Sequence, residues 1–109
     1  MSKILGDIGE RQAVCYLQQL GFTILERNFY AKFGEIDIVA LKDDVVHFIE
    51  VKYSKSYDPL ERITPSKMAK IIKTAKLYMA KRAEVRPFCI DALIIQSDTV
   101  ELIENISII

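Results

Sequence analysis

The sequence has few of the residues that cross-link small proteins. Two cysteines, Cys15 and Cys89, and a single histidine, His47, stand among 109 residues. They cannot make a disulfide framework or a four-ligand zinc site. Both cysteines lie among apolar residues, which predicts buried free thiols. Because 50% of the residues are hydrophobic, the chain can build a core without cross-links, and this composition argues against intrinsic disorder.

The sequence also lacks an apolar run of about 18 to 20 residues, the length that a membrane span requires. It shows no hydrophobic region of a signal peptide, no internal repeat and no low-complexity linker. We therefore expect a single domain over residues 1–109, without a membrane partner and located in a reducing cytoplasm.

Net charge is absent too, because 15 basic side chains balance 15 acidic ones. The balance is uneven along the chain. Residues 52–86 contain ten basic and three acidic side chains and carry +7, so the remaining residues carry −7. Such asymmetry favours a polyanion as partner, although the overall charge does not.

The hydrophobic pattern predicts the element order αβββαβ(β), with one or two strands after the second helix, and hence an α/β sandwich with a mixed sheet. We expect a helix over 7–20 that stops at Gly21, and a second helix from Pro65, capped by Thr64 and ended by Pro87. The expected strands cover 22–30, 33–41, 45–53, 88–96 and, as an edge strand, 99–109. Glu10 precedes the apolar Ala13 and Val14 by three and four residues, which places it on or beside the inward face of its helix.

Charged residues follow the period of two that a strand requires. Strict alternation puts Asp37 on one face of its strand and puts Glu50 and Lys52 together on one face of the next. The opposite face of the Asp37 strand then receives Ile36, Ile38 and Ala40. If the two registers match, Asp37, Glu50 and Lys52 converge.

Two adjacent carboxylates repel each other unless a positive charge lies between them. A divalent cation meets that need, and an oxygen-rich site with few protein ligands suits Mg²⁺. Lys52 could orient or deprotonate a water nucleophile, or stabilise developing negative charge. Phosphodiester hydrolysis requires a metal that polarises the phosphate, a water nucleophile, and neutralisation of charge in the transition state. Glu10 would complete the acidic cluster.

The alternative is a set of ordinary ion pairs, with Glu50 and Lys52 exposed and Asp37 capping a turn. The metal site is favoured because charges flanked by apolar strand residues are costly to bury without a purpose. Asp91 also lies inside an apolar strand and needs a partner if it is buried. For Asp91 we expect a structural ion pair rather than metal binding.

The combined motifs resemble the PD-(D/E)xK restriction-endonuclease-like nucleases. Within them the chain looks like the YraN family, small bacterial proteins of unestablished function that are similar to archaeal Holliday-junction resolvases. The motifs are Gly6-x-x-Gly9-Glu10, Arg27-Asn28-Phe29, Gly34-Glu35-Ile36-Asp37-Ile38-Val39 and Glu50-Val51-Lys52.

The resemblance implies a restriction-endonuclease-like fold with Mg²⁺ or Mn²⁺ as cofactor. Asp37 and Glu50 would be metal ligands, with the Val51 carbonyl as a third and Glu10 as the auxiliary acid. Lys52 would be the catalytic lysine, and Lys67 lies where the family tends to place a lysine near the site.

The sequence departs from this family at two arginine positions. Tyr53-Ser54 follows Lys52 where an arginine is frequent, and Cys89 stands two residues before Asp91 in the place of another. Both changes remove an anion-binding guanidinium, and neither affects the acidic cluster.

Basic residues outside the cluster are candidates for phosphate contacts that do not depend on base sequence. They are Lys55, Arg62, Lys67, Lys70 and Arg27. A solvated helix face explains the helical lysines equally well, and Arg27 could simply hold its hairpin in place.

The leading hypothesis is a metal-dependent endonuclease that hydrolyses DNA, with branched or structured DNA as a candidate substrate. The alternative is a nucleic-acid-binding module on the same fold with little or no catalysis; for a third, a protein-interaction role, the sequence has no positive signal. A homodimer is expected if the protein cuts junctions, because two symmetric incisions are needed. Ile106, Ile108 and Ile109 could form its seam or complete the core.

Overall fold

A five-stranded mixed sheet forms the centre of the computed structural model, which describes residues 3–53, 63–96 and 99–106, with side chains from Gly9 onward. The strands are β1 (Thr23–Ala31), β2 (Gly34–Lys42), β3 (Val45–Tyr53), β4 (Phe88–Gln96) and β5 (Thr99–Ile103), arranged in that order. Among the described strands, the β3–β4 pair is the only parallel one. The predicted mixed sheet and the element order αβββαββ are confirmed.

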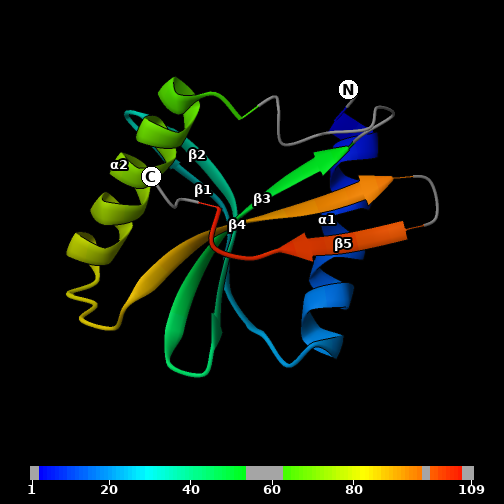
Figure 1. Cartoon of the computed structure of the whole chain (residues 1–109), viewed down its shortest axis with the longest axis horizontal. Helices are drawn as coiled ribbons and strands as arrows, with labels where there is room; N and C mark the ends of the chain where they lie inside the picture. The colour runs from blue at the N-terminus through cyan, green and yellow to red at the C-terminus, as the bar shows by residue number, and fades with distance from the viewer. Residues whose placement is uncertain (1–2, 54–62, 97–98, 107–109) are drawn as a thin grey trace.

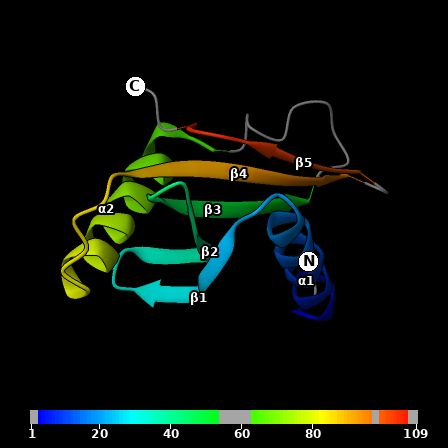
Figure 2. The same cartoon turned by 90° about the horizontal axis from the view of Figure 1, so that it is seen from below.

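Helices α1 (Lys3–Gln19) and α2 (Pro65–Lys81) lie on either side of this sheet, as Figures 1 and 2 show. The sheet separates two hydrophobic cores, and adjacent residues of β3 belong to different ones. Phe48 packs in the same core as Tyr78 of α2, whereas Ile49 packs in the same core as Leu17 of α1. The α2 helix also provides the crossover that parallel strands require. Neither described helix is long and apolar enough to cross a membrane.

Both helices end in backbone-capped turns. After α1, Gly21 has a φ of 94°, and the Phe22 N–H donates to the Leu17 carbonyl over 3.0 Å. The α2 helix begins at Pro65, behind the Thr64 cap, as predicted. Its predicted end at Pro87 is wrong, because Ala83 adopts a φ of 49° and the Glu84 N–H donates to the Met79 carbonyl over 2.9 Å. This capping motif terminates α2 at Lys81.

The side chains of β2 do not alternate strictly, which corrects the predicted faces. Ile36 packs in the core beside α2, whereas Ile38 packs in the core beside α1. On β1, Asn28 has a φ of 54° and lies between Arg27 and Phe29, which pair with Ile38 and Ile36 respectively. A left-handed residue interrupts the regular pleat, so the hairpin changes faces at Asn28 and Asp37.

The predicted burial of both cysteines is wrong for Cys15, which is exposed. Ala13 and Leu17 face the sheet, and Cys15 lies two residues from each, which turns it toward the outer side of α1. Cys89 is partly buried.

The strand at the end of the chain is shorter than expected, since β5 ends at Ile103. Ile106 packs against the core beside α2, and its N–H donates to the Ile90 carbonyl over 2.8 Å. Of the two roles considered for Ile106, it therefore takes the one in the core. The predictions for Ile108 and Ile109, like those for Lys55 and Arg62, lie outside the described residues.

Candidate metal and nucleic-acid site

Asp37 and Glu50 meet where the β2–β3 ladder stops. Backbone pairing runs from Lys42 opposite Val45 to Ile38 opposite Ile49, so Asp37 and Glu50 occupy the next positions. There the Val51 N–H donates to the Asp37 Oδ2 atom over 2.8 Å. The Asp37 carboxylate thus replaces a backbone acceptor between the two strands, which holds it beside Glu50.

The pair is costly to ionise. Burial raises the pKa of Asp37 to about 6, against the lowering effect of the Val51 N–H; Glu35 and Glu10 add to the rise, and Lys52 opposes it. Burial, and then the charge of Asp37, raise the pKa of Glu50 to about 8, although Lys52 lowers it. Burial is the largest cause of both shifts, and the charge of Glu35 adds to each of them.

One oxygen of this pair is left without compensation. The Glu50 Oε1 atom is buried and accepts no hydrogen bond from any residue that the structure describes. A buried carboxylate oxygen without a partner is costly. Adjacent carboxylates with raised pKa and an unsatisfied oxygen suit a hard divalent cation, so the donor set fits Mg²⁺ or Mn²⁺.

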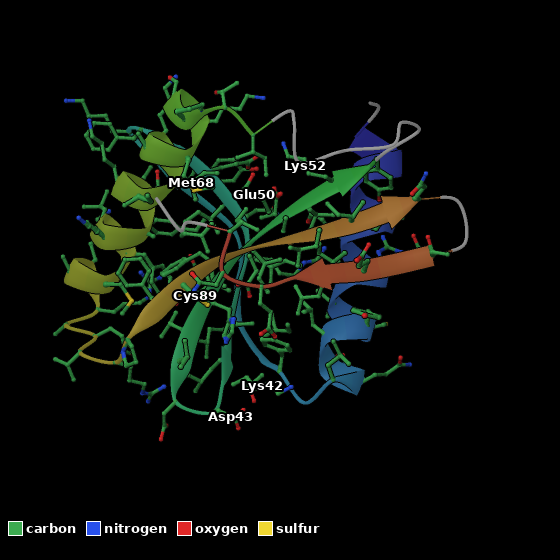
Figure 3. The ribbon with its side chains drawn as sticks, in the orientation of Figure 1. Lys42, Asp43, Glu50, Lys52, Met68 and Cys89 are labelled. Atoms are coloured by element: carbon green, nitrogen blue, oxygen red, sulfur yellow. The ribbon has the colours of Figure 1, made fainter. Side chains whose placement is uncertain are left out.

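Lysines line a cavity that Glu35 and Lys52 also border, and the charges of these two residues act on Asp37 and Glu50. The cavity has a volume of about 170 Å³ and is bordered by Phe33, Glu35, Lys52, Lys67 and Lys70. Figure 3 shows Glu50 and Lys52 on β3 and Met68 on α2. The structure therefore brings Lys67 and Lys70, two of the residues predicted to contact nucleic acid, to the same cavity as the predicted catalytic Lys52.

Glu10 reaches the cluster from the other side of the sheet. Its Oε2 atom accepts hydrogen bonds from the Arg27 Nη2 atom over 3.2 Å and from the Asn28 Nδ2 atom over 3.0 Å. Its side chain is only 15% exposed. The charge of Glu10 raises the pKa of Asp37. Arg27 therefore ties β1 to α1, and its contact with nucleic acid stays a prediction.

The Gly9–Tyr53 contact sets the position of Glu10. A Cβ atom at Gly9 would overlap the Tyr53 hydroxyl oxygen and the adjoining ring carbons, so a larger residue here would require the Tyr53 side chain to move. Tyr53 ends the strand that carries Glu50 and Lys52. The contact brings α1 close to that strand at the residue next to Glu10. Sequence reasoning did not assign this role to Gly9, although a glycine inside a helix indicates a close approach.

The comparisons with known proteins agree with the motifs. A sequence model described as "Uncharacterised protein family UPF0102" matches residues 9–95. The chain belongs to the UPF0102 family. It is 47% identical to a UPF0102 protein of Wolinella succinogenes over 108 residues, which covers 99% of this chain and 100% of that protein.

Other relatives carry the same family name. A UPF0102 protein of Helicobacter pylori is 52% identical over 98 residues, covering 90% of this chain and 86% of the relative. One from Helicobacter hepaticus is 50% identical over 107 residues, covering 98% and 97%. These names state a family and no activity.

A second polar cluster of this UPF0102 protein lies inside the fold, at Asp91. A contact of 2.6 Å joins the fully buried Asp91, through its Oδ2 atom, to the His47 Nδ1 atom. The Oδ1 atom accepts from the Asn105 N–H over 2.8 Å and from the Cys89 thiol over 3.3 Å. The buried Asp91 therefore has the partner that its burial requires, and it forms the expected ion pair when His47 is protonated. Sequence reasoning missed His47 as this partner.

The same cluster sets the protonation state of the Cys89 thiol. Burial and the neighbouring Asp91 raise the pKa of its thiol to about 12, so the thiolate is strongly disfavoured. Cys89 and Asp91 both approach the Nδ1 atom of His47, at 3.1 and 2.6 Å. A catalytic triad instead uses the two different nitrogens of the ring. The three ligand atoms lie within 4.8 Å of one another, but they already bond among themselves.

Proposed function

We propose that this UPF0102 protein is a metal-dependent nuclease that hydrolyses phosphodiester bonds in DNA, with branched or structured DNA as the first substrates to test. One observation carries the proposal. The unsatisfied Oε1 atom of Glu50 lies in a partly buried carboxylate pair, and Lys52, whose charge acts on both acids of that pair, lines the lysine cavity. The resemblance of the Asp37 and Glu50-Val51-Lys52 motifs to the PD-(D/E)xK nucleases supports it.

Asp37 and Glu50 are the residues that would hold Mg²⁺ or Mn²⁺, with the Val51 carbonyl and Glu10 as further expected ligands. The bound cation would supply Lewis-acid activation of the phosphate and would neutralise the carboxylates. The Val51 N–H orients the Asp37 carboxylate, and Arg27 with Asn28 orients Glu10. These hydrogen bonds hold the carboxylates that would bind the metal in position before substrate binds. Effective metal sites use the same arrangement.

The lysines act on the phosphate itself. Lys52 lines the same cavity as Lys67 and Lys70, and its charge lowers the pKa of both Asp37 and Glu50. Lys52 would stabilise the negative charge that develops on the phosphate oxygens, and it could orient the attacking water. Lys67 and Lys70 would bind the neighbouring phosphates and keep the scissile bond near the acids.

The test uses purified protein with Mg²⁺ or Mn²⁺ on linear, nicked and four-way-junction DNA. We expect cleavage of at least one substrate and a loss of about 100-fold or more in Asp37→Ala and Lys52→Met. Glu101→Gln, which neutralises an exposed acid on β5, is the matched control and should cut normally. The proposal fails if wild type and Asp37→Ala leave every substrate equally uncut with both metals.

The second candidate is a nucleic-acid-binding protein with little or no catalysis. The observation in its favour is Cys89, whose thiol packs with His47 and Asp91 where related nucleases often place an arginine. Salt-dependent DNA binding without cleavage, unchanged in Glu50→Ala, would support this function. Junction cleavage would also require two copies of the chain, so the oligomeric state on junction DNA should be measured alongside.

A further inference from the structure

The β1–β2 hairpin exposes two aromatic side chains beside the candidate site. Tyr30 is 71% exposed and Phe33 is 43% exposed. Figures 1 and 2 both show the β1–β2 turn close to α2. Tyr30 pairs across the hairpin with Glu35, which raises the pKa of its hydroxyl by its charge and by a hydrogen bond. Phe33 presents a wholly apolar ring at this turn, at the edge of the lysine cavity.

The ammonium groups of two lysines lie over the Phe33 ring. The Nζ atom of Lys32 lies 6.0 Å from the ring centroid, and that of Lys73 lies 5.4 Å from it. The same ring borders the cavity of Lys52, Lys67 and Lys70. An aromatic face next to several flexible cations matches how proteins bind single-stranded nucleic acid, with bases on rings and phosphates on basic side chains.

We propose that Phe33 stacks on an unpaired base of the DNA whose adjacent phosphate enters the lysine cavity, so that the protein prefers single-stranded or branched DNA to a fully paired duplex. The inference rests on the proposed function and specifies its substrate class. In a duplex the faces of the bases are covered by their neighbours, whereas a single strand, a gap or unpaired bases at a branch point expose them. The lysines would bind either form, and Phe33 would discriminate between them.

The experiment measures binding of fluorescein-labelled DNA by anisotropy in Ca²⁺, which keeps cleavage separate from binding. The probes are a single strand, a strand of the same length that is abasic at every position, a paired duplex and a four-way junction. Phe33→Leu keeps an apolar side chain and removes the ring, and Phe33→Tyr restores a ring. Leu25→Ala is the matched control, because Leu25 is 42% exposed on β1 and lies away from the cavity.

We expect Phe33→Leu to weaken single-strand and junction binding about tenfold, and duplex binding by less than about twofold. Phe33→Tyr should restore binding, and Leu25→Ala should behave like wild type. The abasic strand should bind Phe33→Leu and wild type alike. Thermal melting checks that each variant is folded.

Equal weakening of single-strand and duplex binding in Phe33→Leu, or no weakening at all, would overturn the stacking role alone. If wild type cuts and binds DNA but prefers the duplex, the substrate class is wrong while the proposed nuclease stands. A wild type that binds none of the probes at low salt would overturn this inference together with the proposed function.

Discussion

At the scale of single residues, Glu50 is the most informative side chain. It is partly buried beside a second carboxylate, and its Oε1 atom has no partner in the described parts of the chain. Nothing in the packing of the apolar cores requires a carboxylate there. The protein therefore retains a destabilising group at the place where the motifs put a metal ligand, which is typical of functional sites.

This arrangement predicts a pH dependence of stability. The folded protein binds a proton at Glu50 with a pKa of about 8, above the ordinary value of 4.5. The contribution of Glu50 to the free energy of unfolding is therefore greatest below about pH 4.5. It should fall as the pH rises toward 8. A loss of even about 1 kcal/mol would lower the Tm of a domain of this size by about 4 °C or more.

Thermal melting in EDTA between pH 5 and 8.5 measures this slope. Glu50→Gln should flatten it and raise the Tm at pH 8, and Mg²⁺ should stabilise wild type more at pH 8 than at pH 6. Glu101→Gln serves as the control that keeps the wild-type slope. The pKa assignment is contradicted if Glu50→Gln and wild type show the same pH dependence.

At the scale of elements, the end of α2 depends on one backbone conformation. Ala83 has a φ of 49°, which costs a residue with a Cβ atom about 1 kcal/mol relative to glycine. We expect Ala83→Gly to stabilise the protein by about 0.5–1 kcal/mol, measured by urea unfolding. Ala80→Gly is the matched change inside the last turn of α2, and it should destabilise by a similar amount. Stabilisation by both glycines, or by neither, would show that this cap does not set the helix end.

The contact between α1 and β3 carries a second prediction. Because a Cβ atom at Gly9 would overlap the Tyr53 side chain, Gly9→Ala should destabilise the fold by about 1–3 kcal/mol and shift Glu10 away from Asp37. The same substitution made in a Tyr53→Ala background should cost much less. A double-mutant cycle in urea gives the coupling between the two residues. Coupling near zero would mean that α1 reaches β3 by another contact.

At the scale of the whole molecule, the neutral charge conceals two opposed parts. The acids of the candidate site belong to the part of the chain that carries −7, and Lys52 with the α2 lysines belongs to the part that carries +7. Lys67 and Lys70 lie at the shared cavity, whereas Lys81 is exposed at the far end of the same helix. The fold thus places only some of the lysines at the acidic cluster.

DNA binding should reflect this distribution. In Lys67→Gln/Lys70→Gln, the slope of log K against log salt should decrease in magnitude by about 2, because about two phosphate contacts are lost. Lys76→Gln/Lys81→Gln removes the same charge from the same helix and should change the slope little. Fluorescence titrations at several salt concentrations measure both. Equal slopes in the two double variants would place the phosphates on the whole helix face instead.

The sequence alone determined the element order, the strand that carries Glu50 and Lys52, the Thr64 cap and the stop at Gly21, because these depend on local pattern and local backbone preference. It also indicated that Asp37 and Glu50 meet, since a short turn joins their strands and sets the register. Strict alternation failed at Ile36, where the left-handed Asn28 changes the face of the hairpin.

Only the tertiary structure decided the contacts between residues far apart in the chain. Glu10 meets Arg27 and Asn28 across 17 and 18 residues, and Asp91 meets His47 across 44. No local pattern encodes these distances, because they depend on how α1 packs and how β4 is placed beside β3. The lysine cavity likewise exists only because the crossover lays α2 against the start of β2, beside the carboxylates.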